Sequence, residues 1–190
     1  MNTEKIKQTL QALLTRDKGL LAMDESRGTS NKRFERLGIP QTIEARRSYR
    51  ELLITTPNLS EYISGVILTD ETIKQTTKSG LLMTSVLQQI GIIPGIKVDM
   101  GTVEMAGFPG EKVTEGLEGL RERLAEYAQL GARFAKWRTV ITIGDSIPSY
   151  GCIRTNMQAL ARYAALCQEA QIVPIVEPEV LMEGTHTIQS

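Results

Sequence analysis

IVPIVEPE, residues 172–179, is an apolar run that ends in charged side chains, and this arrangement occurs five times along the chain. The other four runs are GLLAMDE (19–25), GVILTDE (65–71), IIPGIKVD (92–99) and ARFAKWR (132–138). A buried strand favours continuous apolar side chains, because a charge within it loses its hydration. Charge gathered at the carboxyl ends is therefore the pattern of parallel strands whose ends surround a polar site.

Charged residues lie two positions apart in three of these runs. The pairs are Lys97 and Asp99, Lys136 and Arg138, and Glu177 and Glu179. Side chains alternate between the two faces of a strand, so each pair is predicted to point to one side. These pairs indicate a polar site in the mouth of a barrel.

Segments with helical spacing of apolar residues separate the runs. The predicted helices cover residues 4–14, 30–38 with Ser30 as N-cap, 42–54, 82–90, 116–130 and 156–170. Irregular stretches are expected at 100–115 and 139–153, directly after strands. Strict alternation of strands and helices predicts an α/β protein with a parallel sheet, forming a single domain over residues 1–190.

Two architectures fit this alternation. A doubly wound sheet usually has a glycine-rich first turn, and the sequence contains neither GxGxxG nor GxxxxGK[ST]. The charged strand ends favour the (β/α)8 TIM barrel family instead. A complete barrel needs eight strands and typically about 250 residues, so we expect about five of the eight strands in these 190 residues.

Composition narrows the possible partners. The 22 basic and 22 acidic residues are mixed along the chain, so no nucleic-acid-binding patch is predicted. No apolar stretch approaches the roughly 20 residues that span a bilayer, and no secretory signal is apparent. The two cysteines are expected as free thiols. A cytoplasmic protein is predicted, and its single histidine, His186, argues against a histidine-based metal site.

Lys136 carries the first chemical hypothesis. Arg138 lies two residues away on the same strand face, and a second cation so close would lower the pKa of the lysine and favour the neutral amine. A neutral lysine suits Schiff-base chemistry with a carbonyl substrate. A structural salt bridge or an anion clamp remains the alternative.

Carboxylates at the strand ends carry the second hypothesis. Glu177 and Glu179 could transfer protons at a barrel mouth, or pair with a neighbouring lysine. Asp24 and Glu25 could orient or deprotonate a substrate hydroxyl, or cap a turn.

An anion site is the third hypothesis. Ser26, Thr29 and Ser30 precede a predicted basic helix, and hydroxyls and backbone N–H groups at a helix N-terminus bind anions. Lys97 could complete a phosphate pocket. Hydroxyl residues before a helix are, however, usually simple caps.

FAKWR, together with IVPIVEPE, GIKVD and LLAMDES in their order, resembles class I fructose-1,6-bisphosphate aldolase. The resemblance covers essentially the whole chain, including RRSYRELL (46–53) and LARYAALCQ (160–168). It implies a homotetrameric (β/α)8 barrel of glycolysis and gluconeogenesis, which cleaves fructose 1,6-bisphosphate to dihydroxyacetone phosphate and glyceraldehyde 3-phosphate. The family acts through a lysine Schiff base, without a metal or other cofactor.

Site residues follow from this resemblance position by position. The catalytic set it implies is Asp24, Lys136, Glu177 and Glu179, with Lys136 assisting carbinolamine formation rather than forming the Schiff base. The set implied to bind substrate and phosphate is Ser26, Thr29, Arg33, Arg46, Lys97 and Arg138. Three residues depart from the family pattern: Thr29 replaces a common serine, Arg27 a small residue, and Met100 a common lysine.

The Schiff-base lysine of the family lies in a segment like LEGTLLKPN, on the strand after IVPIVEPE, and these 190 residues do not include such a segment. We therefore expect little or no cleavage by this chain alone. The alternative function is a non-enzymatic sugar-phosphate-binding or protein-interaction module.

Overall fold

A five-stranded parallel sheet and eight helices make up most of the computed structural model, which describes residues 3–188. The helices are α1 (Glu4–Leu13), α2 (Arg27–Arg36), α3 (Ile43–Ile54), α4 (Leu59–Tyr62), α5 (Asp70–Ile73), α6 (Met83–Gln89), α7 (Leu120–Gln129) and α8 (Tyr150–Glu169). The strands are β1 (Gly19–Ala22), β2 (Ile63–Leu68), β3 (Ile93–Lys97), β4 (Thr102–Glu104), β5 (Lys112–Thr114), β6 (Phe134–Ile141) and β7 (Val173–Val180).

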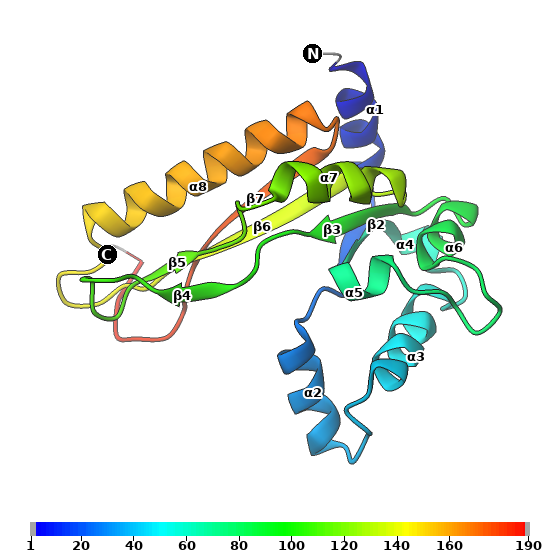
Figure 1. Cartoon of the computed structure of the whole chain (residues 1–190), viewed down its shortest axis with the longest axis horizontal. Coiled ribbons are helices and arrows are strands. Elements are labelled where there is room, and N and C mark those ends of the chain that lie inside the picture. The colour runs from blue at the N-terminus through cyan, green and yellow to red at the C-terminus, as the bar shows by residue number, and fades with distance from the viewer. Residues whose placement is uncertain (1–2, 189–190) are drawn as a thin grey trace.

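The sheet runs in the order β1-β2-β3-β6-β7, and every neighbouring pair is parallel. Helical connections between successive strands are what parallel pairing requires. Figure 1 shows α7 and α8 lying along one side of the sheet, with α1 at one end and α2 and α3 projecting from it. The structure therefore confirms the predicted α/β architecture and all five predicted strands.

The outer face of the sheet packs against the helices. Trp137 of β6 is fully buried there, and its ring lies 5.5 Å from the ring of Tyr163 on α8. Leu68 and Ile96 alternate onto the same face and are equally buried. Aromatic side chains of this size bury a large apolar area, so this layer supplies most of the hydrophobic stabilisation.

The inner face has its own, smaller cluster, which α1 closes at one end. It consists of Leu13, Ile67, Phe134 and Val173. Phe134 needs glycine on β3, its neighbour, and on β2 beyond it, because a Cβ on Gly95 would overlap its ring. A Cβ on Gly65 would come within 2.7 Å of Leu13 and 3.0 Å of Phe134. The two glycines thus make room for the aromatic floor beneath the polar strand ends.

The helix predicted over 116–130 begins only at Leu120, and two other helices begin earlier than predicted. Ser26, not Ser30, caps α2, since its Oγ accepts a hydrogen bond from the Thr29 backbone N–H at 3.1 Å. Ser149 caps α8 in the same way through the Cys152 N–H, so that helix begins at Tyr150 rather than at residue 156. Both cases are governed by the first available hydroxyl, which satisfies an otherwise free N–H.

Neither expected irregular stretch is wholly irregular. Residues 100–115 contain the antiparallel pair β4 and β5, and residues 139–153 contain the end of β6 and the start of α8. Short strands and weakly periodic helix starts carry little signal in a sequence.

Candidate functional site

The polar site lies two residues beyond the layer of Phe134, toward the carboxyl ends of the strands. Ala22, Ile67, Gly95, Phe134 and Val173 are register partners across the sheet. Because side chains alternate along each strand, the next inward-facing residues toward the carboxyl ends include Asp24, Lys97 and Lys136. Charges predicted from separate strands therefore come together on one face.

Lys136 lies between two carboxylates. Its Nζ is 2.7 Å from Oδ2 of Asp24 and 3.2 Å from Oε2 of Glu177, and both Lys136 and Asp24 are largely buried. Burial lowers the pKa of Lys136, but the two carboxylates outweigh it and raise the pKa above its ordinary value. The predicted lowering of this pKa by Arg138 is wrong, because Arg138 turns instead to Glu179.

Asp99 ties β3 to β6. Its carboxylate contacts Lys97 Nζ, accepts a hydrogen bond from the Gly101 N–H at 3.1 Å, and accepts another from the Arg138 N–H at 3.3 Å. Lys97 also donates to the Asp99 carbonyl at 3.1 Å. Lys97 is thus held in position, with its side chain partly exposed.

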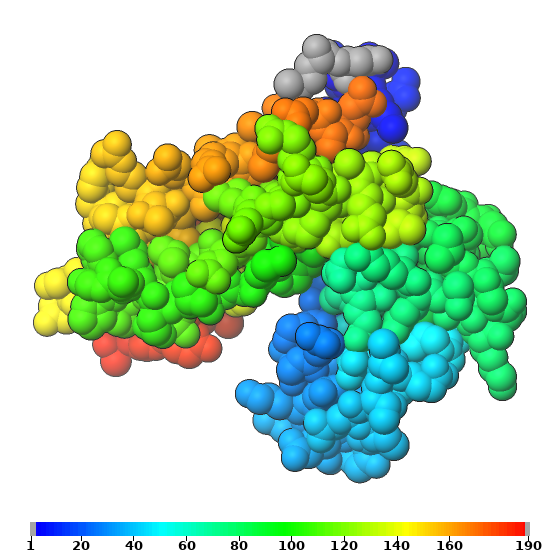
Figure 2. All heavy atoms as spheres, viewed as in Figure 1, coloured from blue at the N-terminus to red at the C-terminus, as the bar shows by residue number. Residues whose placement is uncertain are grey.

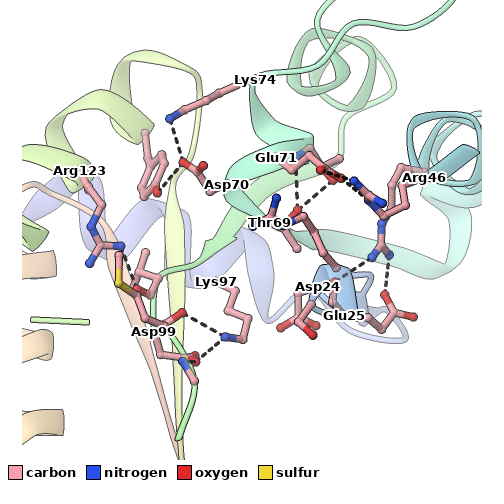
Figure 3. A pocket seen from close by; sticks show the side chains of 18 residues that line it. Asp24, Glu25, Arg46, Thr69, Asp70, Glu71, Lys74, Lys97, Asp99 and Arg123 are labelled. Carbon is pink, nitrogen blue, oxygen red and sulfur yellow. Dashed lines mark hydrogen bonds and ion pairs between the residues drawn. The ribbon is translucent and has the colours of Figure 1, made fainter. Parts of the chain in front are cut away.

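A cavity of about 750 Å³ opens beside these residues, at the carboxyl ends of β1, β2 and β3. Figure 3 shows Lys97, Asp24 and Thr69 around it, with Arg46 on one side and Arg123 on the other. Of the predicted site residues, Asp24, Ser26, Arg46 and Lys97 line this cavity. The other six do not line it: Thr29, Arg33, Lys136, Arg138, Glu177 and Glu179.

Two arginines of α3 hold the strand ends at this cavity. Arg46 donates to both oxygens of Glu71, at 2.7 and 2.8 Å, and to Asn31 Oδ1 at 3.0 Å. Arg50 donates to the carboxylate of Glu25 at 2.5 Å and to the Glu25 carbonyl at 3.2 Å. Burial raises the pKa of Glu25, but the hydrogen bond from Arg50 and neighbouring charges prevail and hold it below its ordinary value.

The pairing of Arg50 with Glu25 is absent from the sequence predictions. Arg46 and Arg50 are four residues apart and therefore lie on one face of α3. That spacing is the available signal, although it does not identify the carboxylates, which lie 25 residues away in either direction, in the loop after β1 and in α5.

The start of α2 borders the same cavity. Ser26 and Thr29 lie 3.0 Å apart, hydroxyl to hydroxyl, and both are exposed. Arg33 of α2 is bound to Glu25, which it shares with Arg50. The predicted phosphate residues Ser26 and Thr29 are therefore adjacent, while Arg33 binds Glu25 of the cavity lining and does not itself line the cavity.

Metal ligands do not gather within residues 3–188, where no three His, Cys, Asp or Glu side chains are placed to hold an ion together. Within the same residues, every helix is too short or too polar to cross a membrane.

A parallel sheet with a cavity and paired lysines and carboxylates at its carboxyl end is the arrangement of a (β/α) barrel enzyme. The sequence model of class I fructose-bisphosphate aldolase matches residues 5–190. The chain belongs to the class I fructose-bisphosphate aldolase family.

Individual relatives agree with this assignment. A Xylella fastidiosa protein described as "Probable fructose-bisphosphate aldolase class 1" is 60% identical over 190 residues, all of this chain and 57% of that protein. Cytosolic fructose-bisphosphate aldolase 4 of Arabidopsis thaliana is 53% identical over 175 residues, 92% of this chain and 44% of the relative. The chain thus spans about half the length of these curated relatives.

A solved structure agrees as well. Fructose-bisphosphate aldolase from Plasmodium falciparum, in a complex with TRAP and a small-molecule inhibitor, superimposes with a TM-score of 0.95 at 47% identity. The match covers 98% of this chain and 55% of that one. The five strands are therefore part of a TIM-barrel sheet, as predicted.

Proposed function

We propose that this chain forms the phosphate-binding and proton-transfer part of a fructose-bisphosphate aldolase site. The parent protein would cleave fructose 1,6-bisphosphate to dihydroxyacetone phosphate and glyceraldehyde 3-phosphate. The observation that carries the proposal is Lys136, whose ammonium lies between Asp24 and Glu177 at the carboxyl ends of the strands. The family assignment supports it.

Lys136 acts in this proposal as a proton donor. Its raised pKa keeps it charged at neutral pH, so it is suited to protonate the hydroxyl that leaves as water when a carbinolamine becomes a Schiff base. The covalent lysine itself belongs to the segment like LEGTLLKPN, outside these 190 residues. Glu177 transfers protons beside Lys136, and Asp24 accepts the proton of the substrate hydroxyl as the carbon–carbon bond breaks.

Phosphate is bound on the other side of Asp24. Ser26, Thr29 and Lys97 hold the 6-phosphate, with hydroxyl donors at the start of α2 and an ammonium from β3. Arg33, Arg46 and Arg138 lie near the substrate, and Glu179 supports this charge network through Arg138.

Two measurements test this function. Calorimetry of the chain with fructose 1,6-bisphosphate is expected to show binding, and uncharged fructose is expected not to bind. Incubation with dihydroxyacetone phosphate and borohydride, followed by intact-mass measurement, is expected to leave the chain unmodified. A reduced adduct on Lys136 would show that this residue is the nucleophile and would overturn the proposed division of roles.

A binding module is the second candidate function. The 750 Å³ cavity is lined by residues between Asp24 and Tyr127, which supports ligand binding by these residues without the rest of the barrel. Binding of the bisphosphate without any cleavage favours the module for the isolated chain, whereas measurable cleavage excludes it.

We further propose that residues 1–190 lie in a single barrel domain of a homotetrameric, cytoplasmic parent protein whose ligand is a phosphorylated sugar. The names of the cytosolic plant relatives support the location. The balance of 22 basic and 22 acidic residues gives no reason to propose a nucleic-acid partner.

A further inference from the structure

The charges that line the 750 Å³ cavity are almost completely paired. Its five carboxylates are Asp24, Glu25, Asp70, Glu71 and Asp99. Each of them contacts a lysine or arginine side chain. An anionic ligand therefore has to be attracted by whatever positive charge is left over.

Six cations line the cavity, one more than the carboxylates. Four of them, Arg46, Arg50, Lys74 and Lys97, are already bound to carboxylates. Arg123 donates to the backbone carbonyls of Val98, at 2.9 Å, and Gly116. Arg123 is thus held by carbonyls without a bound carboxylate, whereas the guanidinium of Arg27 has neither a hydrogen bond nor an ion pair with any residue between positions 3 and 188.

The position of Arg27 at the start of α2 is electrostatically unfavourable. It is the first residue of α2, and the first turn of that helix contains no acidic side chain. The positive end of the helix dipole disfavours a cation there. A bound anion would reverse this effect, because it would interact favourably with both the guanidinium and the free N–H groups of the first turn.

We propose that Arg27 is a further phosphate-binding residue of this site, acting together with Ser26 and Lys97. The inference rests on the proposed sugar-phosphate function. Ser26 is its neighbour in the chain and lines the same cavity, and Lys97 reaches the cavity from β3. A guanidinium offers a planar fork of donors that matches two phosphate oxygens, so Arg27 adds a contact that the small residue common in this family does not provide.

The test is calorimetry of the 190-residue chain with fructose 1,6-bisphosphate at low salt. Arg27→Ala is expected to bind about 10-fold more weakly than the wild type, and Arg27→Lys to lie between them. Arg36→Ala is the matched control, since Arg36 is the last residue of the same helix and does not line the cavity. It is expected to bind as the wild type does.

Thermal unfolding without ligand separates binding from stability. Arg27→Ala is expected to unfold at the same or a higher temperature than the wild type, because it removes an unpaired cation from a helix N-terminus. The difference in affinity is expected to shrink in about 0.5 M salt, where exposed charges are screened.

Each result decides the inference. Equal affinities of the wild type and Arg27→Ala would overturn the role of Arg27 and leave the proposed function standing. An equal loss in Arg36→Ala would show general attraction by the basic helix and would also overturn it. A wild-type chain that does not bind the bisphosphate would refute the proposed binding function, and the inference with it.

Discussion

The two sides of the sheet hold their charged residues in different ways. At β1 and β2 the carboxylates of Glu25 and Glu71 are bound by α3 arginines whose side chains are only 3% and 10% exposed. At β6 and β7 the side chains of the paired Arg138 and Glu179 are each 40% exposed. Figure 2 shows the surface hollowed between the β4–β5 end of the molecule and α2–α3, which separates the two regions.

This difference teaches which part of the site is preorganised within the chain. Buried, doubly hydrogen-bonded pairs keep one geometry, because breaking them leaves a charge without water. Exposed pairs are screened by solvent and exchange partners at little cost. The cavity at β1–β3 is therefore the more rigid part of the site, while the exposed pair of Arg138 and Glu179 is held more loosely.

Arg50 provides the strongest way to break the rigid side. Arg50→Met leaves Glu25 with the exposed Arg33 alone, and we expect a loss of about 3–5 kcal/mol in the free energy of unfolding, measured in urea. Arg33→Met is the matched control, because Arg33 binds the same carboxylate but is 58% exposed. It is expected to cost at most about 1 kcal/mol, and equal losses in the two variants would contradict the comparison.

Lys136 of β6 links the two sides, because it binds Asp24, which follows β1, and Glu177 of β7. Lys136→Met leaves Asp24 without a cation, and we expect a loss of about 2–3 kcal/mol near neutral pH. The pKa of Lys136 is raised above 10.5 in the folded chain. Its stabilisation is thus fully present below pH 10.5 and is lost as the pH rises through the folded pKa.

Urea unfolding of the wild type and Lys136→Met, from neutral pH to above pH 10.5, checks this direction. The difference between their free energies of unfolding is expected to narrow at alkaline pH, and a difference that widens would contradict the prediction. Lys112→Met is the control, since Lys112 lies 3.6 Å from the exposed Glu104 and is expected to cost at most about 1 kcal/mol.

The smallest effect is expected for the exposed pair of Arg138 and Glu179. A double-mutant cycle with Arg138→Ala and Glu179→Ala is expected to give a coupling of about 0.2–1 kcal/mol, which decreases with added salt. A coupling as large as that of a buried pair would mean that β7 is as rigid as β1 and β2, and the contrast between the two sides would be lost.

Much of the fold could be predicted because its signals are local. Five apolar runs ending in charge identify five strands, and helical spacing identifies the segments between them. The helix start at Tyr150 was missed, since residues 150–155 carry little apolar periodicity. The β4–β5 pair is likewise not predicted, because strands of three residues each are too short to show a periodic pattern.

The site is a mixed case. Asp24, Lys97 and Lys136 were predicted to share a polar mouth, and the parallel register brings them to one face. The direction of the pKa shift of Lys136 was wrong, because nearness in sequence suggested Arg138 as its neighbour. The neighbours that decide the shift, Asp24 and Glu177, come from other strands.

The amino-acid sequence by itself determined the strand pattern, the parallel α/β class and, through ordered motifs, the resemblance to an aldolase. These depend on periodicity and residue order, which a chain displays before it folds. Only the tertiary structure decided which charges neutralise one another, including the burial of Arg50 against Glu25 and the lack of a partner for Arg27 among residues 3–188. Such pairing depends on distances between segments far apart in the chain, and these distances are set only once the strands and helices have packed together.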